Sequence, residues 1–264
     1  MIKKVLVTLF WCALVAAPLH ADLKYTTHTE MKPVPGPAPA APQNPLVGMI
    51  AAQMMQQMLP GGPADTVYTI GANGMRMDFV KGGISGSPEG TVMLLMTNGD
   101  IVQLNSKNKT YWKSTAAQMG ALLQSLGMQP QVTVKPGADT VTIAGVRAKR
   151  SDFEISIALP IPEEMRSQLP PGMPTAISMS GEMWAATTPY EKYLPVLSKS
   201  APLVAGMGMS KLIEAGITMR QVTRSDLFGG QQLEMVVTSI GEETVPASQF
   251  AVPADYTEVP SPIK

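Results

Sequence analysis

Hydrophobic and polar residues alternate along most of the chain after its first quarter. Met75, Met77 and Phe79, for example, alternate with Arg76 and Asp78. A period of two is typical of a β-strand with one buried face and one wetter face. The same pattern predicts strands at 153–157, 177–183 and 233–238, and apolar or β-branched runs predict others at 92–97, 101–104, 110–113, 140–143 and 217–224.

Three stretches between these strands have helical spacing instead. Ser114 is suited to cap a helix that ends at Gly127, Thr188-Pro189 opens a second, and residues 207–215 form a short third. Short turns such as Asn98-Gly99-Asp100 and Ala144-Gly145 join neighbouring strands. Strands joined by short hairpins favour an antiparallel sheet, so we predict an α+β, mainly β fold with a few helices packed on one face.

The first residues have the three parts of a secretory signal. A basic start, Met1 to Lys4, precedes an apolar run from Val5 to Ala17, and a small residue, Ala21, precedes the expected cut. This apolar run is shorter than the ~20 residues that a membrane-spanning helix needs. We therefore predict a signal peptide at 1–21 and an exported protein, in the periplasm or outside the cell.

Cleavage would change the chemistry that the chain can carry. Cys12 and His20 leave with the signal, so the mature chain has no cysteine and one histidine, His28. Disulfides, Cys/His zinc sites and Cys–His catalysis are then excluded. The remaining 18 basic and 20 acidic residues give a net charge of −2 and no basic face, which argues against nucleic-acid binding. No later stretch is long and apolar enough to span a membrane, and we expect no cofactor.

The segment after the first strand differs from the rest in composition. Residues 22–32 read as an N-terminal strand, and residues 33–63 combine a proline-rich linker with a helix at 46–59, while 64–259 form the sheet domain and 260–264 a tail. Three glutamines form the only polar stripe on this helix, which makes it a candidate surface for another envelope protein. The candidate interaction residues are Met49, Met54, Met55 and Met58.

Methionine is unusually frequent, with 20 residues in the chain. Flexible thioethers adapt to ligands of varied shape, so an apolar pocket is one interpretation. Copper(I) binding by clustered methionines is a second, and ordinary core filling is the third. The residues that we expect to line an apolar pocket are Met75, Met77, Phe79, Met179, Met183, Trp184 and Met235.

Several short motifs resemble a family of exported bacterial proteins that is described by a domain of unknown function. They include Lys109-Thr110-Tyr111-Trp112, Ile143-Ala144-Gly145-Val146 and Glu182-Met183-Trp184-Ala185, followed by a closing segment at 245–256. That family is in turn similar in fold to the periplasmic lipoprotein carriers. The resemblance implies a curved, half-barrel antiparallel sheet with helices over an apolar cavity, and it implies no catalytic residues. Residues 33–62 depart from the family pattern as an insertion.

Three functions stay open on these grounds. The first is a non-enzymatic carrier or binding protein for a lipid or another apolar ligand. The second is an interaction or structural module of the envelope that uses the helix at 46–59. The third is an enzyme, which we do not expect because no nucleophile–base pair is visible in the sequence.

Overall fold

The computed structural model describes residues 21–35, 62–83, 87–125, 130–158, 175–200, 210–225 and 228–262. Most of the predicted signal peptide, the helix at 46–59 with Met49, Met54, Met55 and Met58, and most of the proline-rich linker lie outside these residues. Five helical segments are described: α2 (Ala116–Ser125), η1 (Glu191–Tyr193), α4 (Leu194–Ser200), α6 (Ser210–Glu214) and η3 (Ala247–Phe250). The described strands are β1 (Asp22–Pro33), β2 (Ala64–Gly71), β3 (Gly74–Lys81), β4 (Thr91–Met96), β5 (Asp100–Asn105), β6 (Thr110–Thr115), β7 (Pro130–Ile143), β8 (Val146–Ala158), β9 (Ala176–Ala186), β10 (Ile217–Ser225), β11 (Gln231–Glu243) and β12 (Thr257–Glu258).

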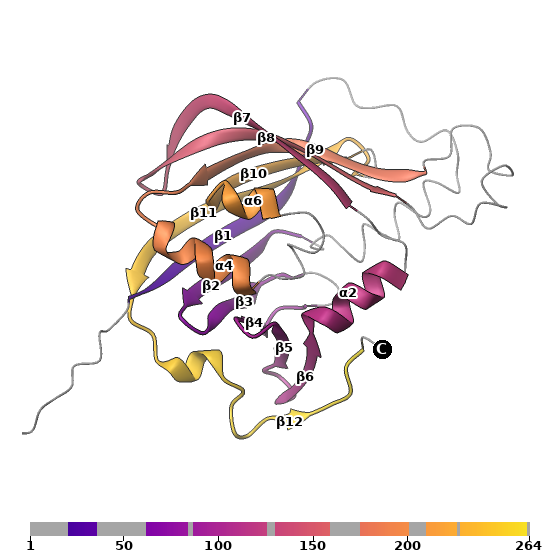
Figure 1. Cartoon of the computed structure of the whole chain (residues 1–264), viewed down its shortest axis with the longest axis vertical. Helices are drawn as coiled ribbons and strands as arrows, with labels where there is room; N and C mark the ends of the chain where they lie inside the picture. Colours follow the sequence, from indigo (N-terminus) through magenta and orange to yellow (C-terminus); the bar gives the residue numbers. More distant parts are fainter. Residues whose placement is uncertain are drawn as a thin grey trace, which may run out of the picture.

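These twelve strands form one curved sheet in the order β12-β6-β5-β4-β3-β2-β1-β11-β10-β9-β8-β7 (Figure 1). Every pairing is antiparallel except that between β12 and β6, which is parallel. The expected antiparallel sheet is therefore mixed at one edge. A parallel strand forms there because the chain returns from β11 along the outside of the sheet before it reaches β6.

Strand β1 lies in the middle of the sheet, between β2 and β11. Its residues from Leu23 to Thr29 pair with β2, and those from Asp22 to Pro33 pair with β11. The first described strand therefore joins two halves of the sheet, β2 to β6 on one side and β7 to β11 on the other.

Two short helices lie against one face of this sheet (Figure 1). Helix α4 contacts β2, β3 and β4, and α6 contacts β7 and α4. The predicted second helix begins with η1 and continues as α4, whose second residue is Pro195. A proline is compatible with the first helical turn, where no backbone donor is needed, so it does not interrupt the helix. In the described part of the chain, no helix is long and apolar enough to cross a membrane.

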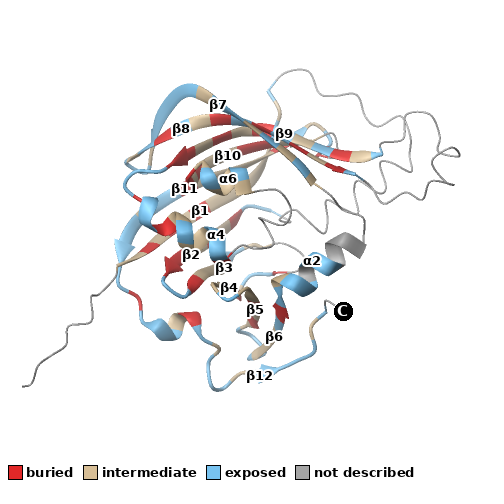
Figure 2. Cartoon of the chain, in the orientation of Figure 1, coloured by how far each residue is buried: buried red, intermediate tan, exposed pale blue. Residues whose placement is uncertain are grey.

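Buried residues form three clusters (Figure 2). The first contains Leu23, Ile70 and Met219 and packs against η1 and α4. The second centres on Phe153 and receives Leu212 from α6. The third lies on β4 and β5 and is covered by Val252 and Tyr256 of the C-terminal segment (members Val92, Leu94, Val102 and Leu104). On β4 this cluster occupies the side that the C-terminal segment covers, and Met93 and Leu95 lie half-buried on the other side.

The structure also changes two local expectations. Strand β7 begins at Pro130, whereas the sequence predicted a strand only from Thr140. Proline and glycine are uncommon within strands, so Pro136 and Gly137 argued against a strand in the first half of β7. This strand is the edge of the described sheet, however, where prolines are tolerated. Arg76 and Asp78 point to the same side of the strand, where charged residues are expected to pair across strands, but they pair with each other along β3, with Nη2 of Arg76 2.6 Å from Oδ1 of Asp78.

Candidate functional site

The helix-covered side of β1 to β6 carries two neighbouring rungs of paired residues without a charged side chain. We call this surface the methionine face, after Met75, Met77 and Met93. Register fixes both rungs, because residues paired across adjacent strands point to the same side. The first rung is Leu23, Ile70, Met75, Leu95, Ile101 and Ser114, and the second is Tyr25, Tyr68, Met77, Met93, Gln103 and Trp112.

Burial differs between the two rungs. Leu23, Ile70 and Ile101 of the first rung are buried. In the second rung, Tyr68, Met77, Met93, Gln103 and Trp112 are all only half-buried. Four of these five side chains are apolar or aromatic, and together with the amide of Gln103 they form a half-buried strip across β2 to β6. Such a strip is suited to contact an apolar ligand.

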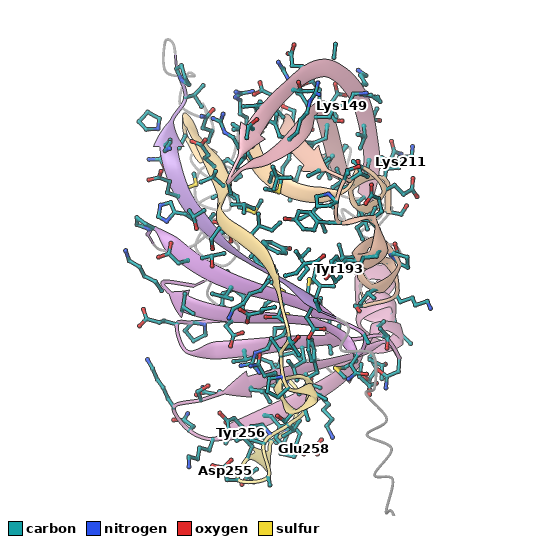
Figure 3. All side chains as sticks on the ribbon, turned by 90° about the vertical axis from the view of Figure 1, so that its left-hand side faces the viewer. Lys149, Tyr193, Lys211, Asp255, Tyr256 and Glu258 are labelled. Carbon is teal, nitrogen blue, oxygen red and sulfur yellow. The ribbon has the colours of Figure 1, made fainter. Side chains whose placement is uncertain are left out.

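Helix α4 and the residues before it close one end of the methionine face. Leu194 and Leu197 pack against the cluster that contains Leu23 and Ile70. Tyr193 lies between the helices and the sheet (Figure 3), and its hydroxyl donates to the backbone oxygen of Ala21 at 2.8 Å. In the full chain this hydrogen bond joins the helix to the residue just before β1, which is the last residue of the predicted signal peptide.

Two tyrosines continue the strip toward the middle of the sheet. The rings of Tyr25 and Tyr68 stack with centroids 4.7 Å apart. Burial raises the pKa of Tyr25 well above its usual value, and the neighbouring Tyr68 raises it further. Burial likewise raises the pKa of Tyr68, against an opposing hydrogen bond with Thr27. Both phenols therefore stay neutral at physiological pH, and the face stays free of charge.

The structure divides the predicted pocket residues into groups. Met75, Met77 and Phe79 lie in alternation on β3, and Met75 and Met77 belong to the two rungs. Met183 is buried in the second core cluster, and Met179 packs against that cluster. Met235 pairs with Thr29 and Gln221. The methionines of β9 thus serve the core beside α6, and those of β3 serve the methionine face.

Trp184 lies apart from the residues of the methionine face. It follows Met183 on β9 and points to the other side of the strand, although part of its surface still packs against the first core cluster. The guanidinium groups of Arg220 and Arg150 lie 4.9 Å and 6.0 Å from its ring centre. A tryptophan held by two cations in this way belongs to a polar network rather than to an apolar pocket.

That network crosses the middle of the sheet on the side opposite the methionine face. Arg220 lies 2.6 Å from Glu234, and Lys32 lies 2.7 Å from the same carboxylate. Lys32 also pairs with Glu30, and His28 lies 2.6 Å from Asp65. Burial raises the pKa of Glu234, but the hydrogen bonds from Lys32 and Arg220 lower it more, so the net shift is downward. The charges of the central strands are thus gathered on one side of the sheet.

Sequence reasoning left out Met93 and Tyr68 from the pocket residues. Met93 lies within Thr-Val-Met-Leu-Leu-Met, which has no alternation, so the sequence does not show which side the residue faces. Tyr68 and Trp112 lie far apart in the sequence, and no local pattern places them on one surface with Met77. Pairing of β3 with β4, and of β5 with β6, supplies the missing information.

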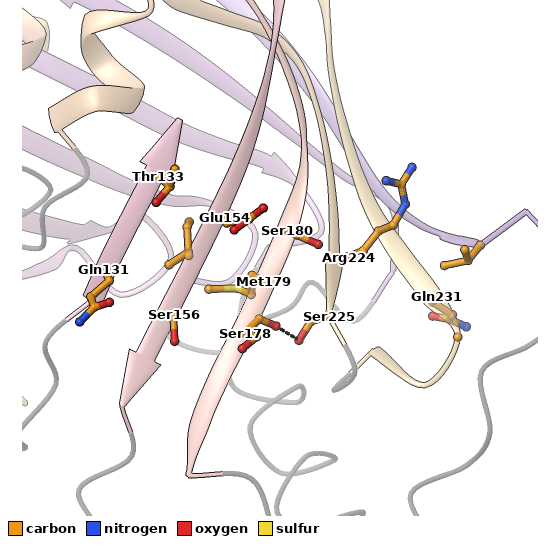
Figure 4. A pocket seen from close by; sticks show the side chains of 13 residues that line it. Gln131, Thr133, Glu154, Ser156, Ser178, Met179, Ser180, Arg224, Ser225 and Gln231 are labelled. Carbon is orange, nitrogen blue, oxygen red and sulfur yellow. Dashed lines mark hydrogen bonds between the residues drawn. The ribbon is translucent and has the colours of Figure 1, made fainter. Parts of the chain in front are cut away.

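A hollow lies away from the methionine face, along the ends of β7 to β11 (Figure 4). Its volume is about 590 Å³. Small hydroxyl residues, Ser156, Ser178 and Ser180, form its centre, and longer side chains, including Gln131 and Arg224, stand around them. The hollow exists because three short side chains lie side by side on adjacent strands.

The described residues contain no group of three or more histidine, cysteine, aspartate and glutamate side chains that could hold a metal ion. Met207 and Met209, two closely spaced methionines that could bind copper(I), lie outside the described residues. Copper binding therefore stays an untested alternative for that part of the chain.

No protein-family model matches the chain. No curated protein matches it at a significant level. Among solved structures, the chain is similar to a LolA superfamily protein from Nitrosomonas europaea, with 7% identity and a TM-score of 0.28 over 89% of this chain and 91% of the other. At this score the likeness identifies neither a family nor a shared ligand. The sequence resemblance to the family with a domain of unknown function stays a prediction.

Proposed function

We propose that this protein is an exported, non-enzymatic binding protein that holds an uncharged apolar ligand on the methionine face. One observation carries the proposal: the half-buried strip of Tyr68, Met77, Met93 and Trp112, on a side of the sheet that bears no charge in either rung. A charged head group would lose its hydration there without gaining a partner, so the bound portion of the ligand is neutral.

Methionine suits this role for a physical reason. Its unbranched thioether side chain adopts many rotamers at similar energy and repacks around different shapes. Met77 and Met93 pair directly across β3 and β4, so two adaptable side chains lie side by side in the middle of the strip. A face of this kind favours a class of apolar molecules, such as acyl chains, over one rigid compound.

The proposal can be tested with N-phenyl-1-naphthylamine, a neutral dye that fluoresces in apolar surroundings. The wild-type protein should give a saturable rise in fluorescence. Met77→Lys should abolish that rise, because an ammonium group in this half-buried strip would have no counter-charge in either rung. Met93→Gln, a milder change, should weaken binding without introducing charge.

Val80→Lys is the matched control for charge. Val80 lies on the same strand, three residues from Met77, but is 51% exposed and faces the other side. It should bind the dye as the wild type does. Absence of a saturable signal in the wild type, or equal loss in Val80→Lys and Met77→Lys, would contradict the proposal. Circular dichroism of each variant distinguishes lost binding from lost folding.

A further inference from the structure

The hollow at the ends of β7 to β11 has a composition that the proposed function does not use. Three hydroxyl residues, Thr133, Ser178 and Ser180, are exposed there, and Ser156 is half-buried. The side-chain hydroxyls of Ser156, Ser178 and Ser180 make no hydrogen bond to another described residue, whereas Ser225 donates to the backbone oxygen of Ser178 at 2.8 Å. A serine hydroxyl both donates and accepts, so this surface offers several neutral sites of both kinds.

The charged residues around the hollow already have partners. Arg224 donates from Nε to Gln232 at 3.1 Å and from Nη1 to Glu182 at 3.2 Å. Glu154 lies 3.5 Å from Lys135. One guanidinium group and one carboxylate, each already paired, offer little to a ligand with a large net charge. A phosphate, for which clustered arginines are typical, is therefore a poor match.

Size and shape also narrow the ligand class. Glu154 and Arg224 flank Ser180 on β8 and β10, about 10 Å apart at the backbone, since adjacent strands are about 4.8 Å apart. A volume of about 590 Å³ is within the range of small-molecule sites. Val34, Ile155 and Met179 contribute apolar surface beside a comparable extent of polar surface, a mixture that suits the C–H faces and hydroxyl groups of a sugar ring.

We infer that this hollow is a second binding site, for a neutral, polyhydroxylated ligand of the saccharide class. The juxtaposition of Thr133, Ser156, Ser178 and Ser180 on three neighbouring strands carries the inference, because each hydroxyl can exchange a hydrogen bond with water for one with a sugar hydroxyl. Gln131 and Gln231 add amide donors and acceptors at two sides of the same hollow.

The test uses the full chain with maltotriose and N,N′-diacetylchitobiose, and tri-alanine as the peptide comparison. Saturation-transfer NMR and calorimetry should detect at least one of the two saccharides and not tri-alanine. Ser180→Leu fills the centre of the hollow and should weaken saccharide binding by about tenfold or more, and Thr133→Val, which removes one hydroxyl at nearly constant volume, by about threefold to tenfold.

Ser239→Leu is the matched control, because Ser239 is an exposed serine of β11 outside the hollow. It should leave saccharide binding unchanged, as should Met77→Lys, which tests the methionine face separately. No binding of either saccharide at millimolar concentration would overturn the inference. Binding that survives both Ser180→Leu and Thr133→Val, or tri-alanine binding with the same sensitivity, would overturn it too.

Discussion

The rings of Tyr25 and Tyr68 stack face to face across β1 and β2, with centroids 4.7 Å apart and planes 3° apart. This pair lies where the central strand meets the methionine face, so it connects the core under α4 to the half-buried strip. Tyr25 belongs to the buried cluster and Tyr68 packs against it. Changes at these residues should affect stability and the binding surface together.

The first prediction concerns alkaline pH. The pKa of Tyr25 is raised in the folded protein, so the fold binds that proton more tightly than the unfolded chain does. The stabilising contribution is therefore complete below the ordinary value of 10.0 and is lost as the pH rises above it. Unfolding monitored by circular dichroism between pH 8 and about 12 should show a steep alkaline limb.

Tyr25→Phe separates ionisation from packing in this experiment. The variant keeps a stacked ring but has no phenol to ionise, so its alkaline limb should lie at higher pH than that of the wild type. Tyr25→Ala should lower the free energy of unfolding at neutral pH by about 3 to 5 kcal/mol, because a large buried ring is removed. An unchanged alkaline limb in Tyr25→Phe would show that other groups control this transition.

The second prediction concerns acid. The folded-state pKa of Glu234 is lowered, so its stabilising contribution is present above the ordinary value of 4.5 and is lost as the pH falls through the lower folded value. Its side chain is 12% exposed, and its carboxylate pairs with both Arg220 and Lys32. Glu234→Gln should reduce the free energy of unfolding at pH 7 by about 1 to 3 kcal/mol and flatten the acid limb.

Glu243→Gln is the control for that variant. Glu243 lies on the same strand and pairs with Lys24 at 2.7 Å, but its side chain is 46% exposed. An exposed pair contributes about 0 to 1 kcal/mol, so this variant should change stability little. Urea titrations at pH 7 and pH 4 compare the free energies of unfolding of both variants. Equal losses of stability in the two variants would contradict the idea that burial makes the Glu234 ion pairs more important.

The third prediction concerns the close approach of β9 and β10. A Cβ atom at Gly181 would collide with the backbone carbonyl of Val222 and touch the ring of Phe153. Backbone atoms cannot rotate away, so Gly181→Ala should lower the free energy of unfolding by about 1 to 3 kcal/mol or more. Gly241→Ala on β11, where a Cβ would meet nothing within 4 Å, should be nearly neutral. Thermal denaturation compares the two.

The fourth prediction concerns residues 36–61, which include the predicted interaction helix. The pairing of β1 with β2 runs from Leu23–Ile70 to Thr29–Ala64, and β1 pairs with β11 as far as Pro33. Replacing 36–61 by a short glycine–serine linker leaves all these pairings in place. The variant should keep its circular dichroism spectrum, with a change in stability below about 1 kcal/mol, since loop-closure entropy varies slowly with length.

The same variant distinguishes an interaction module that uses the helix at 46–59 from a binding protein that uses the methionine face. An interaction module that uses Met49, Met54, Met55 and Met58 would lose its partner in a pull-down from envelope extracts. A binding protein that uses the methionine face would still give the dye signal. Loss of folding would contradict the expectation that the sheet is independent of this segment.

Local patterns in the sequence predicted much of the fold. The alternation of apolar and polar residues located β3, the central parts of β8 and β9, and β11, because side chains of a strand with one buried face alternate between apolar and polar. The turn at Ala144-Gly145 was also predicted, and both residues adopt the positive φ angles that a two-residue hairpin needs. These features depend on neighbours in the chain, so the sequence alone is sufficient to predict them.

Tertiary structure decided what the sequence left open. No local signal shows that β1 lies between β2 and β11, or that Met77 faces Met93 across β3 and β4. Where both sides of a strand carry apolar residues, as in β4, alternation disappears, and pairing with the neighbouring strands decides which side each residue faces. The same holds for Trp184, which the sequence grouped with the methionines and the fold places between Arg150 and Arg220. The sequence determined which residues are apolar, and pairing between distant strands decided which of them share a surface.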